Sequence, residues 1–198
     1  MRIGIDATNI HAGGGVSHLK NLLRFAEPEQ YGIKKIIVWG GKNRLERLPP
    51  NTWLDLVEMP ELNQSLYKRL LWQQTELSKL AHKNCNLLFA PGGLYMGSFR
   101  PYVTMFQNMQ IFEKKERNRE NGKEWLRLRL LQLAQGQTFK IASGLICLSE
   151  YACNYLSQYY PKLVAQTPVQ LIAHGTGNFP NRKKTLLSST NHESIRLL

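Results

Sequence analysis

Residues 2–26 read RIGIDATNIHAGGGVSHLKNLLRFA and contain the pattern that decides the fold. The stretch begins with a short apolar run, Arg2–Asp6, which predicts a strand. It continues through Ala7–Ala12 into three successive glycines. Apolar residues then return at helical spacing, which predicts an amphipathic helix that ends at Glu27-Pro28-Glu29. The apolar positions of this helix are Val16, Leu19, Leu22, Leu23 and Ala26.

The rest of the chain repeats this alternation of short apolar runs and helical patterns. Further strands are expected at Lys35–Trp39, Trp53–Glu58, Asn86–Ala90, Tyr102–Phe106, Gly144–Leu148 and Val169–Ala173. Helices are expected at Leu66–His82, Glu116–Phe139 and Tyr151–Tyr159. Strands that alternate with helices favour a mostly parallel sheet covered on both faces. The sequence therefore predicts an α/β chain with a Rossmann-like, doubly wound sheet.

The composition changes near the C-terminal end. We expect residues 1–180 to form one domain, because 198 residues fit one large domain with a tail. Asn181–Glu193 is polar and basic without periodicity, which is typical of a linker. The apolar run Ile195–Leu198 then predicts the first strand of a missing C-terminal domain, and the alternative is a disordered tail.

The overall composition is that of a soluble, cytoplasmic, basic protein. Hydrophobic residues make up 42% of the chain, and no apolar run approaches the roughly 20 residues of a membrane span. The N-terminus lacks the features of a signal peptide. The three cysteines, Cys85, Cys147 and Cys153, show no metal-binding spacing and are expected to be reduced core residues. The net charge of +12 favours anionic partners such as nucleic acid, lipid headgroups or phosphorylated substrates.

Four segments that follow predicted strands are candidate binding sites. Open α/β sheets bind ligands at the carboxyl ends of their strands. Glycine loops at a helix start can bind phosphate, and amides suit sugar hydroxyls. The candidates are Gly13, Gly14, Gly15 and His18, then Gln107 and Asn108, then Ser149 and Glu150, and finally His174.

Each candidate also has a purely structural interpretation. The glycines can form an ordinary turn, and His18 can be a solvated surface residue. Ser149 is a good N-cap and Glu150 complements the helix dipole, so a structural role is favoured for this pair. Gln107, Asn108 and His18 are the only candidates for a catalytic role, and neither amide can act as a general base. No metal cluster, Walker loop or dinucleotide fingerprint is present in the sequence.

Taken in order, four motifs resemble the large retaining family four of GT-B glycosyltransferases. The opening strand, glycine loop and helix form the first, and Phe89-Ala90-Pro91 resembles a conserved strand end. The run from Ala142 to Ala152, ASGLICLSEYA, is similar to the family pattern A-D-x-[VI]-[IV]-x-[VP]-S-x-[FY]. Val169–Gly175 resembles the stretch before the crossover to the second domain. Together these motifs cover most of the chain.

The resemblance implies a catalytic cycle in a cleft between two domains. The first domain would bind a glycan or lipid-linked acceptor, and the second a nucleotide-diphosphate sugar. The glycine loop would lie on the diphosphate side, and loop N–H groups with basic side chains would stabilise the leaving group without a metal or cofactor. Cell-surface polysaccharide synthesis is the implied pathway, and residues 1–198 alone are expected to be inactive.

Three departures from the family pattern concern function directly. Gln107-Asn108 stands where many members have His-Asp, and Ala173 stands where proline is usual. The family's paired glutamates belong to the second domain.

The expected helix at Glu116–Phe139 suggests a membrane partner. Between Glu113 and Arg129 there are seven basic and four acidic residues, and Trp125 and several leucines lie among the later ones. A basic, partly apolar helix can lie on an anionic membrane. The alternative is a helix with one buried and one solvated face. The proposed contact residues are Lys114, Lys115, Arg117 and Arg119.

Two other classes of function remain open. A non-catalytic nucleic-acid-binding domain would fit the charge, but the basic residues are spread over several elements and no nucleic-acid motif is present. A nucleotide-binding module or oxidoreductase would fit the fold, but it lacks the dinucleotide fingerprint.

Overall fold

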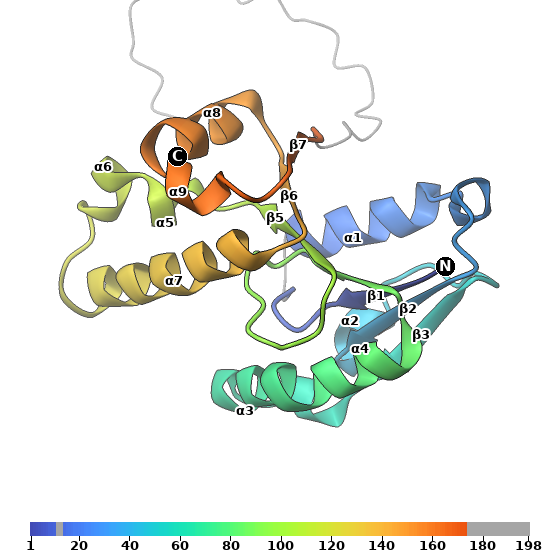
Figure 1. Cartoon of the computed structure of the whole chain (residues 1–198). Coiled ribbons are helices and arrows are strands. Elements are labelled where there is room, and N and C mark those ends of the chain that lie inside the picture. Colours follow the sequence, from blue (N-terminus) through green and yellow to red (C-terminus); the bar gives the residue numbers. More distant parts are fainter. Residues whose placement is uncertain (11–13, 174–198) are drawn as a thin grey trace, which may run out of the picture.

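The computed structural model describes residues 1–10 and 14–173 (Figure 1). Seven parallel strands form one sheet in the order β3-β2-β1-β4-β5-β6-β7. The strands are β1 Arg2–Asp6, β2 Lys35–Gly40, β3 Leu54–Glu58, β4 Leu87–Ala90, β5 Tyr102–Phe106, β6 Gly144–Cys147 and β7 Val169–Leu171. The last two end one and two residues earlier than expected.

Helices and short helical turns connect these strands. The α-helices are α1 Gly14–Phe25, α2 Lys42–Leu45, α3 Leu66–Trp72, α4 Ser78–Asn84, α5 Met109–Phe112, α6 Lys114–Arg117, α7 Gly122–Ile141, α8 Glu150–Tyr159 and α9 Pro161–Val164. Two 3₁₀ turns are η1 Pro28–Tyr31 and η2 Pro60–Asn63. A π turn, η3 Gln73–Leu77, joins α3 to α4 in the helix that the sequence predicts.

The strand order confirms the predicted fold class. From β1 the chain adds β2 and β3 on one side, then returns to place β4 on the other side of β1. This reversal defines a doubly wound, Rossmann-like sheet, and it puts the topological switch point between β1 and β4.

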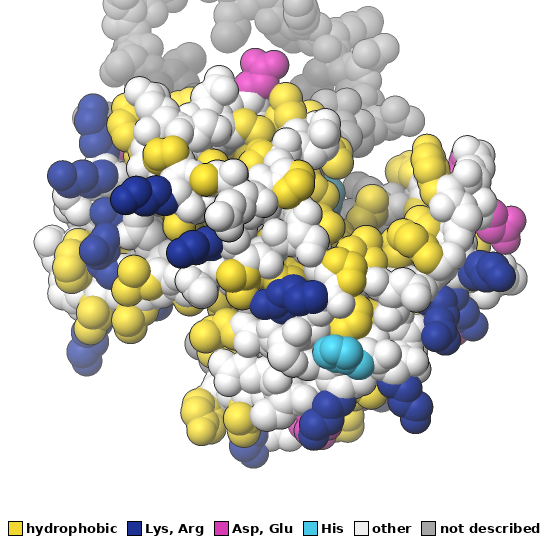
Figure 2. Space-filling model, in the orientation of Figure 1, with side chains coloured by type: hydrophobic (Ala, Val, Ile, Leu, Met, Phe, Trp, Pro, Cys, Tyr) yellow, Lys and Arg dark blue, Asp and Glu magenta, His cyan; other side chains and the backbone are white. Residues whose placement is uncertain are grey.

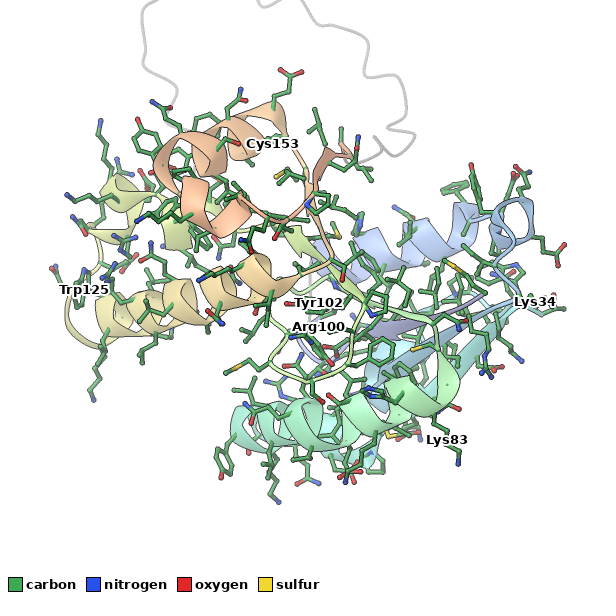
Figure 3. The ribbon with its side chains drawn as sticks, viewed as in Figure 1. Lys34, Lys83, Arg100, Tyr102, Trp125 and Cys153 are labelled. Atoms are coloured by element: carbon green, nitrogen blue, oxygen red, sulfur yellow. The ribbon has the colours of Figure 1, made fainter. Side chains whose placement is uncertain are left out.

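Different helices cover the two faces of the sheet. On one face, Val16, Leu19 and Leu23 of α1 pack with residues of β1 and β2. On the other face, α4 packs near Leu88 and Tyr102, and α7 and α8 pack near β6. The Arg100 guanidinium lies 4.6 Å from the centre of the Tyr102 ring, beside this second core (Figure 3).

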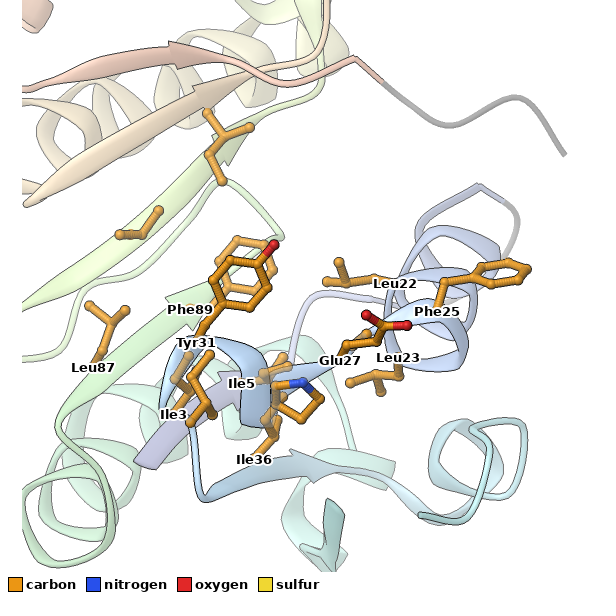
Figure 4. A pocket seen from close by; sticks show the side chains of 15 residues that line it. Ile3, Ile5, Leu22, Leu23, Phe25, Glu27, Tyr31, Ile36, Leu87 and Phe89 are labelled. Atoms are coloured by element: carbon orange, nitrogen blue, oxygen red, sulfur yellow. The ribbon is translucent and has the colours of Figure 1, made fainter. Parts of the chain in front are cut away.

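Helices lie on both faces of the sheet, as the sequence predicts, although the α1 face is only partly covered. An apolar groove of about 470 Å³ lies beside the C-terminal part of α1 (Figure 4). Its walls include Leu22 and Phe25 of α1 and Leu87 and Phe89 of β4. The groove exists because α1 lies over β1 and β2, while β4 to β6 continue beyond it.

The expectation of one continuous helix at Glu116–Phe139 is wrong. The chain forms α6, then a turn, and then α7 from Gly122. Gly122 has a φ of 57°, a left-handed conformation that glycine adopts without strain and that interrupts a right-handed helix. Arg117 is buried and donates a hydrogen bond to the Ile111 carbonyl at 3.1 Å, so it cannot belong to an exposed membrane contact.

The three cysteines are free thiols, as expected for a reduced protein. Cys85 and Cys147 are buried, and Cys153 is partly buried. Burial raises the pKa of the Cys85 thiol to about 11, so it stays protonated at neutral pH.

Candidate functional site

The candidate site lies at the carboxyl ends of β1 and β4, the topological switch point of the sheet. Doubly wound sheets bind ligands in a crevice at this position. The loop after β1 contributes Thr8 and Asn9, and the loop after β4 contributes Gly92 and Gly93. Arg69 and Gln73 reach the same place from the α3–η3 helix.

Asp6, the last residue of β1, is the buried acid of this site. Its Oδ1 accepts a hydrogen bond from the Thr8 backbone N–H at 2.9 Å, and its Oδ2 accepts one from Gln73 Nε2. Burial raises the pKa of Asp6, whereas the hydrogen bonds from Thr8 and Gln73 and the positive charge of Arg44 act in the opposite direction. Asp6 is therefore a carboxylate whose ionisation depends on its neighbours.

Gln73 connects the loops after β1 and β4. The same Nε2 that contacts Asp6 also donates to the Leu94 carbonyl at 3.0 Å. One turn earlier, Arg69 Nη1 donates to the Thr8 carbonyl at 3.4 Å. Both side chains are buried, so this helix fixes the floor of the crevice.

The two loops are also in direct contact. Asn9 Nδ2 donates to the Leu94 carbonyl at 3.4 Å. A Cβ on Gly92 would lie 2.8 Å from Asn9 Cβ, so glycine is needed for this close approach. Gly93 has a φ of 73°, where glycine is favoured.

Gln107 and Asn108 lie at the edge of the same region, after β5. Gln107 is exposed, and its Nε2 donates to the Pro91 carbonyl at 2.8 Å, which links the ends of β4 and β5. Asn108 Oδ1 accepts from the Gln110 N–H at 3.0 Å and caps α5. Sequence reasoning therefore places both residues correctly at the carboxyl edge, while Asn108 also has a structural role.

The remaining candidate residues are those of the glycine loop, His18 and His174. Gly14 and Gly15 begin α1, and His18 is half-buried one turn later. Gly13 and His174 lie outside the described residues.

The structural role favoured for Ser149 is confirmed. Its Oγ accepts from the Ala152 N–H at 3.2 Å, which caps α8. Glu150 is exposed in the first turn of that helix.

Arg44, Arg69 and Gln73 were missed by the sequence analysis. Arginine and glutamine side chains within a helix are usually exposed to solvent, so these residue types do not predict burial beneath the site. One signal existed: Arg69 and Gln73 precede Leu77 and Ala81 at intervals of four residues, and this row is the buried side of the helix.

Replacement of Gln73 by leucine tests the connection between the loops. We expect the free energy of unfolding to fall by about 2 kcal/mol, because Asp6 and the Leu94 carbonyl would lose a buried donor. Urea denaturation measures the change. Gln74→Leu, at the neighbouring exposed position, is the control and should change stability by less than about 0.5 kcal/mol. If both replacements lower the free energy of unfolding equally, Gln73 does not connect the two loops.

The pKa of Asp6 predicts a pH dependence. Because folding raises this pKa above 3.8, its contribution to stability is complete below 3.8 and is lost as the pH rises through the folded-state value. The unfolding free energy of the wild type minus that of Asp6→Asn should therefore fall with rising pH. Urea denaturation of both proteins between about pH 4 and 7.5 gives this difference. A difference that grows with pH would show that the pKa is lowered.

Comparisons with known proteins give a similarity to a solved structure and no match to a family model or a curated protein. No protein-family model matches the sequence, and no curated protein matches it. Among solved structures, a sucrose-phosphate synthase from Thermosynechococcus elongatus is similar, with 12% identity and a TM-score of 0.49. The match covers 89% of this chain and 90% of that chain.

The strand order defines the class of protein, a Rossmann-like α/β domain with a topological switch point between β1 and β4. Over residues 1–10 and 14–173, no helix is long and apolar enough to cross a membrane. Within the same ranges, no group of three or more His, Cys, Asp or Glu side chains could hold a metal ion.

Proposed function

We propose that residues 1–180 are the acceptor-side domain of a GT-B glycosyltransferase. The reaction would transfer a sugar from a nucleotide-diphosphate sugar to a glycan or lipid-linked acceptor, with retention of configuration. The observation that carries the proposal is the position of Asn9, Gly92 and Gln107 in the contacting loops at the carboxyl edge of the sheet, beside the β1–β4 switch point. The motifs that resemble the retaining family supply the reaction type.

The chemistry of the crevice suits a polyhydroxylated ligand. Asn9, Gln107 and Asn108 provide amide donors and acceptors, and such groups can pair with sugar hydroxyls in either direction. Gly92 lets the loop after β4 approach Asn9 closely. In this proposal the donor binds to a second domain, and neither a metal nor a cofactor is required. The pathway would be bacterial cell-surface polysaccharide synthesis.

Nuclear magnetic resonance tests the proposal on the isotope-labelled chain. Oligosaccharides and a lipid-linked saccharide in detergent should shift the amide signals of Asn9, Gly92 and Gln107. Gln107→Leu should weaken binding several-fold, because it removes a donor and an acceptor. Gln110→Leu, at an exposed position on α5, is the matched control. If NADH or duplex DNA shifts these signals and saccharides do not, the proposal is wrong.

We also propose that α7 contacts an anionic membrane at the inner face of the cell membrane, where a lipid-linked acceptor would be presented. Leu126, Leu130 and Leu133 follow one another at helical spacing and are 53%, 59% and 65% exposed. Lys123 and Arg127 lie beside this leucine row. Over α7, Figure 2 shows hydrophobic side chains among Lys and Arg side chains, and Figure 3 places Trp125 near the start of the helix.

A replacement of all three leucines by glutamine tests the membrane contact. We expect binding to vesicles that contain anionic lipid to fall at least tenfold, because each leucine contributes about 1.5–3 kcal/mol when it leaves water. Co-sedimentation measures the binding. Leu71→Gln on α3, where Leu71 is 47% exposed, is the control and should bind normally. Unchanged binding of the triple variant would exclude this surface.

A further inference from the structure

A second, polar hollow lies beyond the carboxyl end of β2. It has a volume of about 400 Å³ and is separate from the apolar groove beside α1. Three cations and two amides line it: Lys42, Asn43, Arg44, Arg47 and Asn63. Figure 1 shows α2, which carries several of these residues, beside β1 and β2. We refer to this feature as the α2 hollow.

The fold holds the walls of the α2 hollow in place. Leu45 and Leu48 are buried in the core and anchor this segment of the chain. Arg44 and Arg47, which precede them, are therefore held in place at the α2 hollow. On the opposite wall, Asn63 packs against Gly41, where a Cβ would lie 2.3 Å from Asn63 Oδ1. Glycine at position 41 therefore leaves room for the Asn63 side chain in this position.

The lining carries only positive charge. No acidic residue lines the α2 hollow among the described residues, although Glu46 and Glu61 belong to neighbouring turns. Lys42 and Arg47 are exposed, so their side chains can reach a ligand from solvent. Such a lining attracts anions and excludes cations.

Arg44 connects the α2 hollow to the buried acid of β1. It is half-buried, and burial together with the nearby charge of Arg69 lowers its pKa, while Asp6 raises it. Two guanidinium groups thus lie within electrostatic reach of each other and of one carboxylate. A bound anion would reduce the repulsion between these two cations.

The position and size are also those of a ligand site. The α2 hollow opens at the carboxyl edge of a parallel strand, one strand away from the switch point. Small-molecule sites typically have volumes of about 300–1,000 Å³. Arginine binds phosphate oxygens in a bidentate manner, and asparagine amides can pair with hydroxyl groups beside the phosphate.

We infer that the α2 hollow binds the phosphate group of a small phosphorylated ligand, either free phosphate or a sugar phosphate. Arg44 and Arg47 would contact the phosphate oxygens, and Asn63 would contact neighbouring hydroxyls. The inference rests on the residues of α2 and η2, not on glycosyl transfer. It can therefore fail while the proposed function stands, and the reverse also holds.

Titration of the chain at low salt tests the inference, with inorganic phosphate and a hexose phosphate as separate probes. Both should shift the amide signals of Gly41 to Arg47. Arg47→Gln should weaken binding roughly tenfold or more, because it removes charged hydrogen bonds. Arg47 is exposed, so this change should leave the fold intact. The triple variant Lys42→Gln, Arg44→Gln, Arg47→Gln should bind neither probe.

Lys34→Gln is the matched control, because it removes one exposed charge just before the opposite end of β2 (Figure 3). It should bind both probes normally. Tighter binding of the hexose phosphate would assign a sugar phosphate, and equal affinity would assign free phosphate. The inference is overturned if neither probe binds, or if Lys34→Gln weakens binding as much as Arg47→Gln.

Discussion

Replacement of Phe139 by alanine is expected to lower the free energy of unfolding by about 3–5 kcal/mol. Phe139 is fully buried, and its ring stacks on Phe112 at 5.5 Å and meets Phe106 edge-on at 5.7 Å. The replacement removes both aromatic contacts and leaves a cavity between α7 and the sheet. Urea denaturation measures the change.

Leu130→Ala is the control on the same helix. Leu130 is 59% exposed, so its loss should change stability by less than about 0.5 kcal/mol. A cost below 1 kcal/mol for Phe139→Ala would mean that the packing around α7 differs from that described.

Replacement of Asp6 by alanine is expected to cost about 3 kcal/mol near pH 4, because two buried donors lose their acceptor. The variant leaves the Thr8 N–H without its acceptor and removes the carboxylate that faces Arg44 and Gln73. Because these groups shape the crevice, loss of ligand-induced signal shifts at Asn9 should accompany the loss of stability. Denaturation and the saccharide titration measure the two effects.

Asp55→Ala provides the comparison for the Asp6 variant. Asp55 pairs with Lys35 at 2.9 Å, but both side chains are more than 40% exposed. Exposed ion pairs contribute about 0–1 kcal/mol. If Asp6→Ala and Asp55→Ala lower the free energy of unfolding equally, Asp6 does not stabilise the loop after β1.

The sequence predicts this fold well where burial and periodicity agree. In α1, Val16, Leu19 and Leu23 are all buried as their spacing indicates. In α7 the spacing of apolar residues does not predict burial, because Gln132 and Gln135 are buried while Leu130 and Leu133 are exposed. A pattern of apolar residues identifies the apolar side of a helix, but it does not show that the sheet covers that side.

The sequence shows where the loops at the carboxyl edge lie, but it does not show the helix beneath them. Gln107 and Gly14 could be placed because strand ends are visible in the sequence, and strand ends meet at one edge of a parallel sheet. Gln73 donates a hydrogen bond to Asp6, and Arg44 lies near enough to lower the pKa of Asp6 by its charge. Both residues are far from Asp6 in the sequence, and no local pattern encodes such proximity.

The π turn at Gln73–Leu77 has a consequence for insertions and deletions in this helix. A π turn holds one residue more than an α-helix needs over the same path. Deletion of one residue there would leave a regular α-helix of almost unchanged length. It would also keep Arg69 and Leu77 on the same side of the helix, because residues seven positions apart share one face of an α-helix. A deletion among Gln74, Thr75 and Glu76 should therefore spare both the hydrogen bond from Arg69 to the Thr8 carbonyl and the core.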